Sequence, residues 1–183
     1  MPERPLLTFD MDGVLCRPPL GFNPGSGQGK DREAAGKKGL AWLTEGFRYN
    51  LRRPMPGAVE GFRRLSEQYR CVVVTARGGP AEALTRRWFE EHFGFVPELH
   101  LRPHWNETSA QYKARKMQEL QPLAHFEDDP FTAQWVAELV PAVFLVDWRR
   151  NRWLTGQNIH RITRLEEAIP LLAQLERPGT ASE

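Results

Sequence analysis

The sequence has few cysteines, little net charge and no long apolar run. Its two cysteines, Cys16 and Cys71, lie far apart and lack metal-binding spacing, so we expect reduced thiols and no disulfide framework. The 25 Lys and Arg residues nearly balance the 23 Asp and Glu residues, so net charge alone indicates neither a nucleic-acid nor a membrane partner. No stretch is apolar for the length that crosses a bilayer, and the first residues lack the apolar core of a secretion signal. These absences predict a soluble cytoplasmic protein without a membrane partner.

The rest of the composition is that of an ordinary globular protein. The chain has 183 residues and is 40% hydrophobic, which suits a single domain over residues 1–183. Short apolar runs alternate with segments of helical periodicity, and the expected strands lie within LLTF, RCVVVTAR, ELHLR, AHFEDDP and AVFLVDW. We therefore predict an α/β fold, a doubly wound, Rossmann-like parallel sheet of about five strands with helices on both faces.

Residues 17–54 differ in composition from the remainder of the chain. They are rich in Gly, Pro and Lys, and we interpret them as a small cap or flap inserted after the first strand. GSGQGK, at 25–30, is not a phosphate loop, because Pro24 stands where the first glycine is required and Asp31 follows the lysine. Basic residues alternate here with aromatic ones, which is compatible with a solvated lid or with a nucleic-acid contact.

Acidic residues follow two of the predicted strands. Asp10 and Asp12 end the first strand, and Glu127, Asp128 and Asp129 end the fourth. Parallel strands present their carboxyl ends at one edge of the sheet, so these carboxylates should gather there. Two carboxylates ~4 Å apart repel by about 4 kcal/mol at an effective dielectric constant of ~20, and a divalent cation removes that cost. Oxygen ligands without a His or Cys cluster favour Mg²⁺.

Four segments resemble the motifs of the haloacid dehalogenase-like (HAD) hydrolases in the correct order. They are FDMDGVL, Thr75 after CVVV, a lysine on the helix that precedes the fourth strand, and FEDDP. The resemblance covers about Leu6 to Val146 and is closest to phosphatases with a small cap or none. Lys113 and Lys116 compete for the third motif.

The resemblance implies a catalytic role for four residues. Asp10 is the expected nucleophile that forms an aspartyl-phosphate, and Asp12 the expected general acid and base. Thr75 is expected to donate a hydrogen bond to the phosphate, and Lys113 to offset its negative charge.

The resemblance also implies a metal site and substrate contacts. Mg²⁺ is expected to bind Asp10, the backbone carbonyl of Asp12, and Asp128, with Glu127 or Asp129 helping directly or through water. Asp129 is alternatively a helix cap, because it precedes Pro130. The expected substrate-binding residues are Gly13, Arg77 and Lys116, and the basic residues His100, Arg102 and His104 lie near the same edge.

The predicted function is a magnesium-dependent phosphatase that hydrolyses a phosphomonoester, either a small metabolite or a nucleotide. Two alternatives remain open at this point. One is a nucleic-acid end phosphatase that uses the basic insertion, supported by a weak similarity of TRRWFEEHFGF and LHLRP to the phosphatase part of polynucleotide kinase–phosphatases. The other is a non-enzymatic binding module, against which the intact Asp10 and Asp12 pair argues. The sequence does not indicate an oligomeric state.

Overall fold

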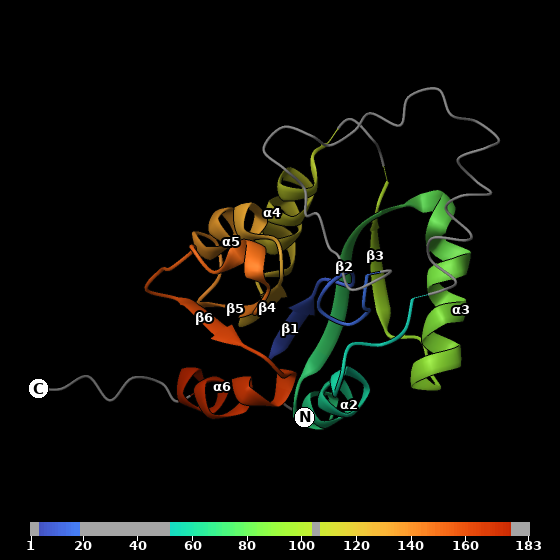
Figure 1. The fold of residues 1–183 in the computed structure, drawn as a ribbon, viewed down its shortest axis with the longest axis horizontal. Helices are drawn as coiled ribbons and strands as arrows, with labels where there is room; N and C mark the ends of the chain where they lie inside the picture. Colours follow the sequence, from blue (N-terminus) through green and yellow to red (C-terminus); the bar gives the residue numbers. More distant parts are fainter. Residues whose placement is uncertain (1–3, 19–51, 104–106, 177–183) are drawn as a thin grey trace, which may run out of the picture.

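The computed structural model describes residues 4–18, 52–103 and 107–176. These residues form an α/β fold around one parallel sheet of six strands in the order β3-β2-β1-β4-β5-β6 (Figure 1). The strands are β1 (Leu6–Phe9), β2 (Arg70–Gly78), β3 (Glu98–Arg102), β4 (Ala124–Glu127), β5 (Ala142–Val146) and β6 (Ile159–Ile162). The predicted parallel sheet is confirmed.

The sheet has six strands where the sequence predicted about five. The missed strand is β6, an edge strand that pairs with β5. It is four residues long, and its central residues His160 and Arg161 are polar and at least partly exposed. An edge strand needs no continuous apolar run, because one of its sides faces solvent rather than another strand.

Helices cover both faces of the sheet, as predicted (Figure 1). One apolar cluster joins Leu7 and Phe9 of β1 to α2, α3 and α6, and a second joins Val72 and Val74 of β2 to α4 and α5. Alternate strand residues therefore point to opposite faces. The helices are α2 (Ala58–Gln68), α3 (Glu82–Phe93), α4 (Ser109–Leu120), α5 (Pro130–Ala137) and α6 (Ile169–Leu175), with short 3₁₀ turns η2 (Gly79–Ala81), η3 (Arg149–Asn151) and η4 (Leu165–Ala168).

Several helix ends follow directly from the sequence. α3 stops at Gly94, which adopts φ 77°, a left-handed conformation that glycine tolerates. Thr108 and Gln111 form a capping box at the start of α4. The last helical segment is divided into the 3₁₀ turn η4 and the helix α6, and Pro170 lies in the first turn of α6. Proline is tolerated there since its missing N–H has no partner to lose.

The strand order places a topological switch point between β1 and β4. From these two neighbouring strands the chain winds outward in opposite directions, to β2 and β3 on one side and to β5 and β6 on the other. In open parallel sheets, ligands bind beyond the carboxyl ends of the strands at such a point. Asp10 follows β1 there, and its backbone N–H donates to the carbonyl of Phe126 in β4 at 2.8 Å.

The two ends of the predicted insertion lie side by side next to β1. The N–H of Arg17 donates to the carbonyl of Arg53 at 2.7 Å, and the N–H of Met55 donates to that of Leu15 at 2.8 Å. The chain segments at the two ends of the predicted insertion are therefore hydrogen-bonded to each other. Residues 19–51, most of the predicted cap, lie outside the described residues, as does His104. In the described parts of the chain, no helix is both long and apolar enough to cross a membrane.

Candidate active site

The loop after β1 is a tight turn built on Gly13. Gly13 adopts φ 94°, which is unfavourable for residues with a Cβ. The N–H groups of Leu15 and Cys16 both donate to the carbonyl of Met11, at 3.0 and 2.9 Å. The Gly13 carbonyl accepts from the indole N–H of Trp148 at 3.0 Å. This turn keeps Asp10 and Asp12 at the carboxyl end of β1.

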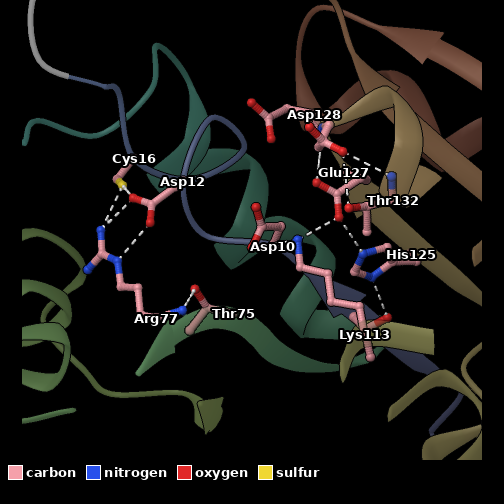
Figure 2. A network of polar contacts seen from close by, with 12 residues as sticks. Asp10, Asp12, Cys16, Thr75, Arg77, Lys113, His125, Glu127, Asp128 and Thr132 are labelled. Atoms are coloured by element: carbon pink, nitrogen blue, oxygen red, sulfur yellow. Dashed lines mark hydrogen bonds and ion pairs between the residues drawn. The ribbon is translucent and has the colours of Figure 1, made fainter. Parts of the chain in front are cut away.

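Lys113 of α4 lies between two buried carboxylates. Its Nζ is 3.0 Å from Oδ1 of Asp10 and 2.6 Å from Oε2 of Glu127 (Figure 2). Burial raises the pKa of Asp10 to about 7, against the opposing effect of Lys113. Burial disfavours the charged form of Lys113, but the carboxylates of Asp10 and Glu127 outweigh it and raise its pKa above the ordinary value.

Glu127 organises the end of β4. Its Oε1 accepts from the backbone N–H groups of Asp128 and Asp129 at 3.0 and 3.1 Å, while Oε2 also faces Nε2 of His125 at 3.3 Å. Nδ1 of His125 lies 2.9 Å from the hydroxyl of Thr8 in β1. Burial opposes the charge of Glu127, but Lys113 and His125 hold its pKa below the ordinary value. Sequence reasoning missed His125 and Thr8. The available signal was a polar residue inside each of the short strands β4 and β1.

The next two acidic residues have different surroundings. Oδ1 of Asp129 accepts from the N–H and the hydroxyl of Thr132, at 3.0 and 3.1 Å. Asp129 therefore caps the N-terminus of α5, which was one of its two roles expected from the sequence. The carboxylate of Asp128 pairs with the guanidinium of Arg150, and its backbone carbonyl accepts from Nδ2 of Asn151 at 2.9 Å. Arg150 and Asn151 were not identified from the sequence, because nothing in their local pattern links them to FEDDP.

Three of these carboxylates could hold a metal ion. Asp10, Glu127 and Asp128 each offer an oxygen within 4.8 Å of the others, and all three residues are buried. Burial raises the pKa of Asp128 well above its ordinary value, despite Arg150. A group of buried carboxylate oxygens that includes no His or Cys ligand fits a hard divalent cation such as Mg²⁺. The residues present therefore fit the predicted metal.

The carboxylate of Asp12 lies apart from this cluster and carries other partners (Figure 2). Arg77 reaches both of its oxygens, Arg52 pairs with Oδ1, and the thiol of Cys16 donates to Oδ1 at 2.9 Å. Burial alone would raise the pKa of Asp12, but Arg77 and then Arg52 outweigh it and hold the pKa below its usual range. The metal ligand expected from this residue is its backbone carbonyl and not this carboxylate.

The remaining predicted site residues divide into two groups. Thr75 is buried in β2, which continues to Gly78, and its hydroxyl accepts from the N–H of Arg77 at 3.3 Å. Lys116 instead pairs with Glu119 on the surface of α4 at 2.6 Å. It lines a cavity of about 330 Å³ beside β3, together with His100. The structure thus brings Asp10, Asp12, Thr75, Lys113, Glu127 and Asp128 to one edge of the sheet and places the side chain of Lys116 elsewhere.

Sequence comparison identifies no matching family model and no matching curated protein. Solved structures do match. A D,D-heptose 1,7-bisphosphate phosphatase from B. bronchiseptica, complexed with magnesium and phosphate, has a TM-score of 0.58 and 14% identity over 93% of this chain and 98% of that one. A haloacid dehalogenase-like hydrolase from Streptococcus pneumoniae has a TM-score of 0.62 and 13% identity over 92% and 98%.

A phosphoserine phosphatase, solved as an analogue of its phospho-aspartyl intermediate, has a TM-score of 0.53 and 12% identity over 93% of this chain and 99% of that one. These matches confirm, at the level of the fold, the similarity to HAD-like hydrolases expected from the sequence. The chain adopts the fold of HAD-superfamily phosphatases over most of its length.

Proposed function

We propose that the protein is a magnesium-dependent phosphatase that hydrolyses a phosphomonoester through an aspartyl-phosphate on Asp10. The observation that carries this proposal is the group of Asp10, Lys113, Glu127 and Asp128, buried together at the switch point of the sheet. Structures with the same fold include phosphatases, one of them solved with magnesium and phosphate.

Asp10 and Asp128, with the backbone carbonyl of Asp12, would hold the metal ion. When bound, Mg²⁺ supplies positive charge that lets a carboxylate and an anionic phosphate approach each other. A carboxylate oxygen of Asp10 attacks phosphorus, a bond from that oxygen to phosphorus forms, and the bond to the leaving oxygen breaks. Arg77 and Arg52 keep Asp12 ionised in the free protein, so we propose that the negative charge of the bound phosphate raises its pKa and that Asp12 then gives a proton to the leaving oxygen.

The second step reverses the role of Asp12. Water loses a proton to the carboxylate of Asp12 while its oxygen attacks phosphorus, and the bond from phosphorus to Asp10 breaks. Lys113 remains beside Asp10 and balances its negative charge when phosphate leaves. Thr75 lies near the carboxyl end of the adjacent strand β2, from which its hydroxyl would donate to a phosphate oxygen.

We further propose that the substrate is a small phosphorylated metabolite or nucleotide. Two structures with this fold are linked to sugar bisphosphates. One is a heptose 1,7-bisphosphate phosphatase, and the other was solved in complex with xylulose-1,5-bisphosphate. The basic residues that would support a nucleic-acid substrate belong mainly to 19–51, outside the described residues. The proposal of a small substrate therefore rests on these two structures.

Phosphate release from a panel of esters tests the proposed activity. Sugar phosphates, nucleoside monophosphates and end-phosphorylated oligonucleotides are incubated with and without Mg²⁺, and inorganic phosphate is measured. We expect release from at least one small ester, its loss in EDTA and its recovery when Mg²⁺ is restored. Metal-independent release, or no release from any ester by folded, metal-loaded protein, would contradict the proposal. Release confined to oligonucleotides that declines steeply with salt would instead indicate the nucleic-acid alternative.

Replacing Asp128 should weaken metal binding. We expect Asp128→Asn to lower Mg²⁺ affinity at least about 10-fold, because one anionic ligand becomes a neutral amide. Titration calorimetry of the purified variant gives the affinity without reference to activity. Asp129→Asn is the matched control, because asparagine caps a helix about as well as aspartate does and the Asp129 side chain is engaged with Thr132. Equal losses in the two variants would show that Asp129 also binds the ion.

A further inference from the structure

The two carboxylate oxygens of Asp12 are held unequally. Oδ1 accepts from Nη2 of Arg77 at 2.6 Å and from the thiol of Cys16 at 2.9 Å, and it also pairs with Arg52. Among the described residues, Oδ2 accepts from one donor, Nε of Arg77 at 2.9 Å. The guanidinium of Arg77 therefore donates to both oxygens, a bidentate arrangement that fixes the plane of a carboxylate. Oδ2 is the less crowded oxygen and the one with room for a further partner.

Arg77 is itself rigidly placed. Its side chain is 1% exposed, and Nη1 donates to the hydroxyl of Thr85 in α3 at 3.2 Å. Its backbone N–H donates to the hydroxyl of Thr75, so it is connected to the residue expected to contact phosphate. Arg77 is thus held by Thr75 at its backbone and by Thr85 at its guanidinium. Because Arg77 is fixed, its hydrogen bonds to Asp12 leave that carboxylate little freedom to rotate (Figure 2).

Arg52 reaches Asp12 from the returning end of the insertion. Its backbone carbonyl accepts from the indole N–H of Trp88 in α3 at 2.6 Å, and its side chain is 5% exposed. Strand β2 and the insertion thus each contribute one guanidinium to the same carboxylate. This arrangement ties the returning end of the insertion to the side chain that transfers the proton.

We propose that Arg77, assisted by Arg52, is a positioning residue that orients Asp12 so that Oδ2 exchanges the proton with the leaving group and then with water. This inference rests on the proposed phosphatase function. Asp12 takes up a proton on Oδ2 when the anionic phosphate lies beside it. In the first step this proton passes to the leaving oxygen as the bond from that oxygen to phosphorus breaks, and in the second step Oδ2 receives a proton from water. Arg77 stays bound to both oxygens throughout and transfers no proton. A misplacement of about 1 Å at a reacting group can cost ~10²-fold in rate. Loss of the bidentate hydrogen bonds from Arg77 should therefore slow proton transfer by Asp12.

The test compares two esters that differ in their need for a general acid. p-Nitrophenyl phosphate releases a stable anion and needs little protonation, whereas glycerol 2-phosphate releases an alkoxide that must be protonated. We expect Arg77→Lys to lower kcat/KM for glycerol 2-phosphate at least about 10-fold more than for p-nitrophenyl phosphate, because lysine lacks the planar fork. The ratio kcat/KM reports the step in which the leaving group departs. Asp12→Asn sets the upper limit of this selectivity.

Further variants separate positioning from folding and from substrate binding. Arg52→Lys should shift the ratio in the same direction by a smaller factor, and it keeps the test valid if Arg77→Lys does not fold in thermal unfolding measurements. Arg70→Lys, at the start of the same strand and paired with Glu98, should leave the ratio unchanged. In the Asp12→Asn background, Arg77→Lys should no longer alter the ratio.

Equal losses on both esters would overturn the inference and make Arg77 a substrate-binding residue, as predicted from the sequence. An unchanged ratio in both arginine variants would overturn it as well. A wild-type protein that hydrolyses neither ester and no member of the wider panel would instead contradict the proposed phosphatase function.

Discussion

Asp10→Asn should lower phosphate release by at least about 10³-fold, because an amide is a poor nucleophile and cannot form the aspartyl-phosphate. The change removes one carboxylate oxygen and alters the shape of the side chain very little. The rate constant on the best ester of the panel, measured with saturating Mg²⁺, gives the size of the effect. In the wild type, rapid acid quenching during turnover of a ³²P-labelled ester should trap label on the protein, and the variant should trap none.

The same variant should remain folded. Burial already raises the pKa of Asp10 to about 7, so the site tolerates an uncharged group there when no metal is bound. We expect the unfolding temperature of Asp10→Asn in EDTA to lie close to that of the wild type. A folded variant that keeps wild-type turnover would exclude Asp10 as the nucleophile and with it the proposed mechanism.

Lys113→Met should destabilise the metal-free protein by about 3–5 kcal/mol, because it leaves the buried carboxylates of Asp10 and Glu127 without their cation. Methionine keeps the length and unbranched shape of lysine, so the effect reports the charge rather than a cavity. For a chain of this size each kcal/mol lowers the unfolding temperature by about 2–4 °C. Thermal unfolding in EDTA measures the loss, and phosphate release should fall with it because Asp10 loses its partner.

Lys116→Met is the matched control for this prediction. Lys116 lies one turn further along α4 and pairs with a partly exposed Glu119. A surface pair of this kind contributes about 0–1 kcal/mol, so the variant should keep its stability within that range. If the two variants lost equal stability, or if Lys116→Met alone abolished phosphate release, the role proposed for Lys113 would be wrong.

The sheet shows where sequence patterns predict structure well. Buried strands such as AVFLV are continuous apolar runs, and the covering helices carry 3.6-residue periodicity with recognisable caps at Gly94 and Asp129. The short edge strand β6 has neither feature, because solvent covers one of its sides. The same reasoning could not describe residues 17–54, whose composition lacks a clear periodicity.

The amino-acid sequence by itself determined that the acidic residues of FDMDG and FEDDP would meet, since each lies at the carboxyl end of a strand of the predicted parallel sheet and such ends share one edge. It could not determine which lysine of α4 lies beside Asp10. Lys113 and Lys116 are three residues apart on one helix, and the packing of α4 against the sheet buries Lys113 and leaves Lys116 at the surface. Tertiary structure also decided the contacts of Asp12 with Arg77 and Arg52, which are 65 and 40 residues away in the chain. Such contacts depend on how distant segments pack, and no local periodicity records them.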